Sequence, residues 1–172
     1  MVIMTVTAAR TAPERRPAQH HVGLGLPVPV VAALVLLAAP RAVVHDLQLL
    51  APGGLAAAVL ALVPLLVWVA VAVLWSARPL TTLVTAGLGY GAVLAVVHNV
   101  AWGTAFAGVP PRLGGNLEGA FSTFTEEIVM RGAASISSLA TGALIGAVCG
   151  LIAWGVQTLV RRSGTRLPLA RG

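Results

Sequence analysis

Four long apolar segments dominate the 172-residue sequence and constrain what it can fold into. The clearest, residues 55–75, contains no charged side chain. About 20 helical residues cross the ~30 Å hydrocarbon core of a bilayer. Only 9% of the chain is charged, against about 25% in a typical soluble domain. We therefore predict an all-α integral membrane bundle of four transmembrane helices.

Charge divides the chain into three parts. We expect residues 1–21 to form a disordered basic cytoplasmic tail, residues 22–160 the four-helix transmembrane domain, and residues 161–172 a second basic cytoplasmic tail. Within the transmembrane domain, the predicted spans are about 24–44, 55–75, 80–107 and 133–160. The predicted outer loop, residues 108–132, precedes the last span.

The sequence leaves two helix boundaries undecided, the end of the first helix and the start of the last one. Pro40 can kink or end the first helix, so residues 40–50 either continue that helix or lie at the membrane interface. Thr123-x-x-Glu126 fits a capping box, so a helix could begin at Thr123, ahead of the fourth span. Pro64 should bend the second helix at its middle.

Arginine supplies all 11 basic residues, a Lys-free composition common in GC-rich bacteria. When the segments alternate across the membrane, the two tails and the loop at 76–79 share eight arginines, and the opposite side holds three with four of the five acidic residues. The positive-inside rule then predicts an N-in/C-in protein of the bacterial cytoplasmic (inner) membrane. The arginines are not interleaved with aromatic residues, so we expect the lipid bilayer as partner and no nucleic acid.

Small residues recur at intervals of four in the third and fourth spans. Such ladders let transmembrane helices approach closely, because lipid supplies no hydrophobic force between helices. We expect these two spans to pack together, with a homo-oligomer contact as the alternative use. The ladders are Gly87, Gly91, Ala95, Asn99, Gly103 and Ala107, and Ser138, Gly142, Gly146 and Gly150.

Polar residues inside or beside the spans are the candidate functional groups, because such residues are costly in lipid. His98 and Asn99 lie within the third span, where an interhelical hydrogen bond is the simplest role. An imidazole can also carry protons or bind metal. The full candidate cluster is His45, Asp46, His98, Asn99, Glu126, Glu127 and Arg131, with Arg41 nearby.

A metal site in this cluster would require side chains that are far apart in the sequence to lie close together in the fold. His45, Asp46, His98 and Glu127 have ligand chemistry suited to zinc, yet no local spacing brings them together. Interfacial ion pairing, such as Glu127 with Arg131 at i,i+4, is the simpler reading. We expect no metal or other cofactor, and we assign no catalytic residue.

The sequence Glu126-Glu127-Ile128-Val129-Met130-Arg131-Gly132 resembles the E-E-x-x-x-R-G signature of the CAAX-processing and bacteriocin-processing intramembrane proteases. That resemblance implies a metal-dependent membrane protease in which the glutamates surround a catalytic water. It covers seven residues. The family's later histidine motifs have no counterpart, since no histidine follows His98, and the chain has fewer spans than that fold. The protease is therefore the remote alternative.

We expect a non-enzymatic accessory or structural subunit of the membrane, either homo-oligomeric or bound to another membrane protein. The alternative is a small oligomeric transporter or channel component that uses His98. The sequence does not specify a substrate or a partner.

Overall fold

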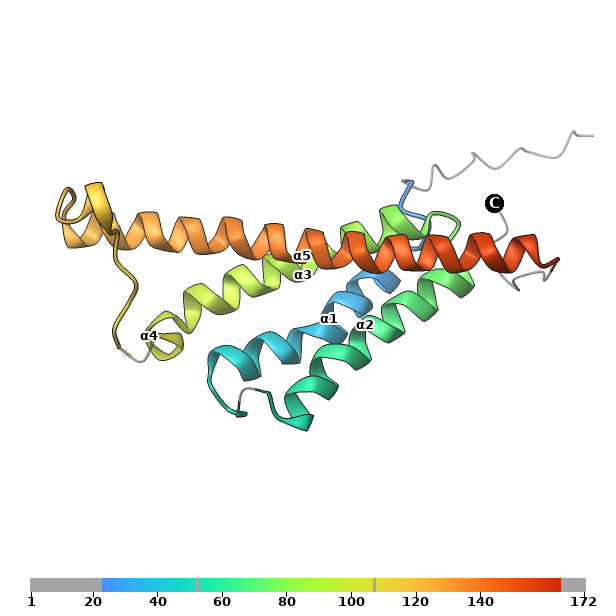
Figure 1. The fold of residues 1–172 in the computed structure, drawn as a ribbon, viewed down its shortest axis with the longest axis horizontal. Coiled ribbons are helices and arrows are strands. Elements are labelled where there is room, and N and C mark those ends of the chain that lie inside the picture. The colour runs from blue at the N-terminus through green and yellow to red at the C-terminus, as the bar shows by residue number, and fades with distance from the viewer. Residues whose placement is uncertain (1–22, 52, 107, 165–172) are drawn as a thin grey trace, which may run out of the picture.

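The computed structural model describes residues 23–51, 53–106 and 108–164, and within these ranges the chain is helical without any strand. The elements are α1 (Val28–Asp46), α2 (Leu55–Trp75), α3 (Pro79–Val100), the short α4 (Trp102–Ala105), the 3₁₀ turn η1 (Gly115–Leu117) and α5 (Thr123–Arg162) (Figure 1). The predicted all-α class is confirmed. The expected N-terminal tail and most of the C-terminal tail lie outside the described residues.

The first helix continues through Pro40 and ends at Asp46. A proline inside a helix removes one backbone hydrogen bond and bends the axis without having to end the helix. Residues 40–46 therefore belong to α1, and only the residues after Asp46 leave it. Gln48 then takes a left-handed conformation, with φ 53°, as the chain turns toward α2.

The third helix is shorter than the predicted span of 80–107. It ends at Val100, and the chain turns at Ala101 before the single turn of α4. Apolar composition alone continues past this point, so the sequence pattern placed the end too late. The prediction for Ala107 lies outside the described residues.

The last helix begins at Thr123, ten residues before the predicted span of 133–160. Ser122 caps it by accepting a hydrogen bond from the Thr125 backbone N–H. The outer loop predicted over 108–132 is correspondingly shorter, because its last ten residues are helical. At 40 residues, α5 is about 60 Å long, twice the thickness of a bilayer core.

The pair α3 and α5 forms the centre of the fold, and its contact runs through glycines. A Cβ atom on Gly91 would lie 2.7 Å from the Ser138 carbonyl oxygen, and one on Gly87 would overlap the Gly142 carbonyl oxygen and lie 2.8 Å from the Gly146 Cα. Backbone-to-backbone approach of this kind requires residues without side chains. The helices α1 and α2 cover one side of this pair (Figure 1).

A buried polar cluster joins α2 to α5 at the end of the bundle away from α4. Gln157 Nε2 donates to the carbonyls of Ala72, Val73 and Ser76, at 3.1, 2.9 and 2.9 Å. The Ala72 carbonyl also accepts the Ser76 backbone N–H, whereas the carbonyls of Val73 and Ser76 lie at the end of α2, where the helix supplies no further N–H. Ser76 also bonds Thr82 at 2.8 Å. This contact holds α2 against α5 at one end only.

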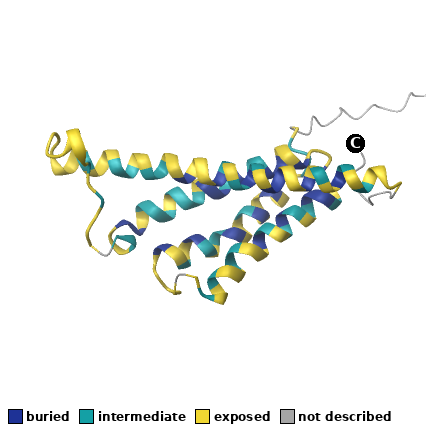
Figure 2. Cartoon of the chain, viewed as in Figure 1, coloured by how far each residue is buried: buried dark blue, intermediate teal, exposed yellow. Residues whose placement is uncertain are grey.

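Four of the helices, α1, α2, α3 and α5, are long and apolar enough to cross a membrane. Their outward faces carry exposed large apolar side chains, among them Leu62, Leu66 and Leu144 (Figure 2). The buried core is small and centres on Trp68, Leu83 and neighbouring alanines. Much of the apolar surface is thus turned outward rather than into the protein.

Candidate functional site: a polar crevice at the α4 end

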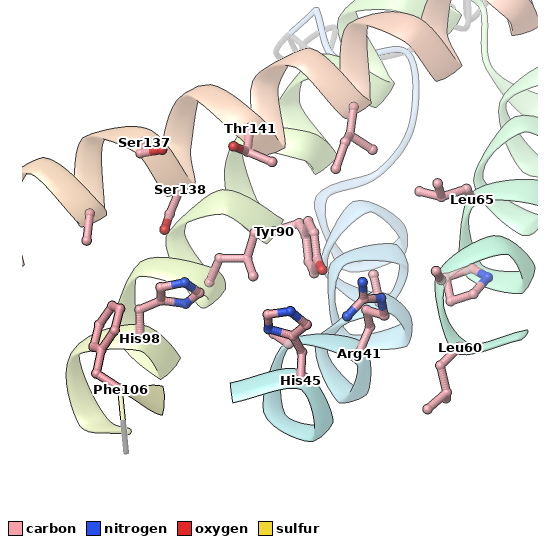
Figure 3. Close-up of a pocket in the computed structure, with 17 residues that line it drawn as sticks. Arg41, His45, Leu60, Leu65, Tyr90, His98, Phe106, Ser137, Ser138 and Thr141 are labelled. Atoms are coloured by element: carbon pink, nitrogen blue, oxygen red, sulfur yellow. The ribbon is translucent and has the colours of Figure 1, made fainter. Parts of the chain in front are cut away.

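α2 and α5 are joined at Gln157 and separate toward α4, while the end of α1 stays against α3 (Figure 1). The divergence leaves a partly open cavity of about 470 Å³ between them. All five α-helical elements or their ends contribute to its wall, as Figure 3 shows. A second cavity of about 660 Å³ adjoins it and shares Arg41, His45 and His98.

Asp46 is the most buried charged side chain at this end, with 2% of it exposed. Its Oδ1 lies 3.0 Å from Nδ1 of His45, and its Oδ2 lies 2.6 Å from Nδ1 of His98. The first contact is a hydrogen bond, whereas the second lacks the in-line angle of one. We treat it as a close ionic contact, because 2.6 Å is short enough for strong attraction whenever the imidazole is protonated. The pair links the end of α1 to the last turn of α3.

Asn99 begins a second polar group on the side of α3 that faces α5. Its Nδ2 donates to Ser135 Oγ at 2.9 Å and to the Ala95 carbonyl at 2.8 Å. Arg131 Nη1 donates to the Asn99 carbonyl at 2.8 Å, which satisfies one of the free carbonyls at the C-terminus of α3. These bonds join α3 to α5.

Arg131 makes two further contacts that fix this corner. Its Nη2 lies 2.8 Å from Glu127 Oε1, and its guanidinium carbon lies 4.8 Å from the centre of the Trp102 ring. Trp102 also packs edge-on against Phe106, with 4.8 Å between ring centroids. The arginine therefore connects α5 both to the end of α3 and to α4, where the chain turns.

Glu126 takes part in neither group. It accepts a hydrogen bond of 2.5 Å from the Leu113 backbone N–H and so ties the loop to the first turn of α5. The candidate residues thus divide into three sets, with His45, Asp46 and His98 in one, Asn99, Glu127 and Arg131 in another, and Glu126 alone. Among the described residues, no three His, Cys, Asp or Glu side chains are grouped to hold a metal ion.

The candidate packing residues are divided in a similar way. Those that lie at the contact of α3 with α5 are Gly87, Gly91, Ser138, Gly142, Gly146 and Gly150. Ala95 is half-buried one turn further on. Gly103 lies in α4, where a Cβ atom would meet nothing within 4 Å, because α3 has already ended.

Sequence reasoning passed over several polar groups of the crevice wall. Tyr90 projects into it from α3, while Ser137 and Thr141 line it from α5 (Figure 3). The available signal was helical spacing, since these two hydroxyls are four residues apart and flank the small-residue ladder. The sequence assigns Gln157 no particular role, yet it is buried against the end of α2.

No protein-family model matches the chain, and no match was found among curated proteins or solved structures. The function must therefore be inferred from the chain's own residues.

Proposed function

We propose that the chain is a multipass protein of the bacterial inner membrane, with four spans and both termini in the cytoplasm. The exposed apolar faces of the four long helices support insertion. Arg78, Arg161 and Arg162 lie at the end of the bundle away from α4, and the acidic residues Glu118, Glu126 and Glu127 lie at the opposite end. The positive-inside rule assigns the arginine-rich end to the cytoplasm.

We further propose that it acts there as a non-enzymatic accessory subunit. The observation that carries this proposal is the overhang of α5. The Arg131 bond to the Asn99 carbonyl places the end of α3 beside residue 131, so residues 123–130 continue past it. Those eight residues extend about 12 Å.

The overhang has an apolar stripe that no described part of the chain covers. Phe124 and Ile128 are four residues apart on one face and are 73% and 54% exposed. The charges of Glu126, Glu127 and Arg131 keep this segment at or beyond the membrane interface, because such charges are costly in hydrocarbon. An exposed apolar stripe outside the lipid is typical of a contact with another protein.

The test is site-specific photo-crosslinking in intact cells. A photoreactive residue at Ile128 should give one discrete adduct with a second membrane protein or a second copy. Leu144, which is also exposed but lies in the middle of α5, is the control and should give none. A strictly monomeric purified protein, with no adduct from position 128, would contradict the accessory role.

Orientation is tested separately by labelling cysteines in a Cys149→Ala background, because Cys149 is the single cysteine of the chain. A membrane-impermeant maleimide should label a cysteine at Asn116 in intact cells and one at Ala77 only after lysis. The reverse pattern would overturn the N-in/C-in assignment.

A second candidate is a transporter or channel component. It is favoured by the contact of Asp46 with His98 at the wall of a cavity that spans several helices. Flux in proteoliposomes should then fall when His98 is replaced by alanine and stay unchanged for the loop variant Arg112→Gln. Equal flux in all three proteins would remove His98 from any transport mechanism.

A further inference from the structure

Arg41 has no partner for its charge among the described residues. It lines both cavities, yet within the described residues it forms no hydrogen bond and no ion pair. Asp46, the acidic residue closest along α1, is already contacted on each oxygen by an imidazole. The positive charge of Arg41 is therefore uncompensated at the wall of the crevice. Leaving a guanidinium in such a place is costly unless an anion or water meets it.

Three hydroxyl groups of α5 line the same cavity and have no hydrogen-bond partner among the described residues. Serine and threonine in helices commonly bond the carbonyl four residues back, as Ser135 and Thr158 do here. Ser137, Ser138 and Thr141 form no such bond within the part of the chain that the structure describes, and all three line the cavity. Their hydroxyls are free to donate to a ligand.

Tyr90 completes the set from the opposite wall. Its hydroxyl points to the space beside Arg41 (Figure 3) and forms no hydrogen bond within the described residues. A guanidinium and several free hydroxyls together can donate many hydrogen bonds to one acceptor group. Phosphate oxygens suit this arrangement, because arginine binds them with two parallel hydrogen bonds.

The remainder of the wall is apolar, and includes Leu60, Leu65, Leu94 and Ile145. A volume of about 470 Å³ falls within the range of about 300–1,000 Å³ found for small-molecule pockets. The cavity is only partly enclosed, with α2 and α5 both contributing to its wall, so it opens to the surroundings of the bundle. In a bilayer those surroundings are acyl chains.

We infer that the crevice binds one anionic phospholipid. Its phosphate lies against Arg41 and receives hydrogen bonds from the hydroxyls of Tyr90 and Thr141, while its acyl chains leave through the gap between α2 and α5. Arg41 lies five residues before the end of α1, about 7 Å along the helix axis, which is a depth that a headgroup at the membrane interface can approach. This inference rests on the proposed insertion into a membrane.

The experiment compares lipid retention by the full-length protein in nanodiscs of phosphatidylglycerol and phosphatidylcholine, followed by native mass spectrometry. Wild type should retain one phosphatidylglycerol and little phosphatidylcholine. Arg41→Gln should lower that retention about tenfold or more, with Arg41→Lys between the two. Arg112→Gln removes the same charge from the exposed loop and should behave like wild type.

Thr141→Val is included in case Arg41→Gln fails to fold, because Thr141 is exposed and forms no hydrogen bond with the described part of the chain. It should lower retention about threefold with an unchanged melting temperature. Equal retention by wild type, Arg41→Gln and Thr141→Val, or equal binding of both lipids, would overturn the inference.

A further experiment distinguishes the phosphate of a bound lipid from free inorganic phosphate. Inorganic phosphate at high concentration should not displace the bound lipid, and displacement would show that the site takes a soluble anion instead. Flotation of the protein with liposomes reports insertion on its own. If the protein floats normally but Arg41→Gln does not lower phosphatidylglycerol retention, only the lipid site is contradicted. If the protein does not float with liposomes, the proposed function is contradicted.

Discussion

Gly87 and Gly142 lie directly against each other where α3 crosses α5, so a Cβ atom on either glycine would overlap the backbone of the other helix. The overlap involves carbonyl and Cα atoms rather than a flexible side chain, and the helices can relieve it only by moving apart. This contact is among the closest approaches of α3 to α5, the two longest helices, and limits how near they can lie to each other.

Replacement of Gly142 by alanine should therefore destabilise the protein by at least about 1–3 kcal/mol, the usual cost of overpacking. Gly155→Ala is the matched control, because Gly155 lies in the same helix and a Cβ atom there meets nothing within 4 Å. Both changes raise helix propensity by about 1 kcal/mol, so only the steric term differs. Thermal melts in detergent measure it, and equal melting temperatures would contradict the close contact.

Replacement of Gln157 by leucine should destabilise the bundle by about 1–3 kcal/mol, because the Val73 and Ser76 carbonyls at the end of α2 lose their donor in a buried site. Thr158→Val is the control, since Thr158 bonds only the carbonyl four residues back in its own helix. Unfolding in a denaturing detergent gives the comparison. If both variants unfold alike, Gln157 does not hold α2 to α5.

Asp46 and His98 should show energetic coupling across α1 and α3. We expect a coupling energy of about 1–3 kcal/mol from a double-mutant cycle with Asp46→Asn and His98→Ala, because the two atoms are 2.6 Å apart and the carboxylate is buried. His45→Ala should couple more weakly, since 65% of the His45 side chain is exposed and solvent screens its interaction. Additive effects of Asp46→Asn and His98→Ala would indicate that the contact contributes nothing.

Replacement of Arg131 by glutamine should loosen the corner between α3 and α4. It removes the donor to the Asn99 carbonyl and the cation over the Trp102 ring. Hydrogen exchange of the amides at 101–106 should become at least about tenfold faster, as local opening costs less, while amides in the middle of α5 keep their rates. Arg112→Gln is the charge-matched control. Unchanged exchange at 101–106 would contradict this role.

The bounds of α2 could be predicted from the sequence because its apolar run stops abruptly at both ends, with Gly53-Gly54 before it and Ser76 after it. The end of α3 could not be predicted in the same way. The apolar residues continue past Val100, and the helix stops where Arg131, from a distant part of the chain, takes the Asn99 carbonyl. Such an end is a tertiary feature without a local signal.

The candidate site shows the same limit. The i,i+4 spacing is enough to predict a pair between Glu127 and Arg131. The contact of Asp46 with His98 depends on where α1 crosses α3, which packing elsewhere in the bundle determines. The sequence does not distinguish Arg41 from the other charges near the interface. Its lack of an ion-pair partner among the described residues follows from the structure, in which both Asp46 oxygens contact histidines.

The length of α5 has a mechanical consequence. Gly142 divides the helix into 19 residues before it and 20 after it, so the tight contact with α3 lies at its midpoint. An unbroken rod held at its centre behaves as a balanced lever. Rocking about this point carries the segment around Ile128 and the segment around Arg161, which lie 14 and 19 residues from Gly142, in opposite directions, so a movement at one end of the bundle is accompanied by a movement at the other.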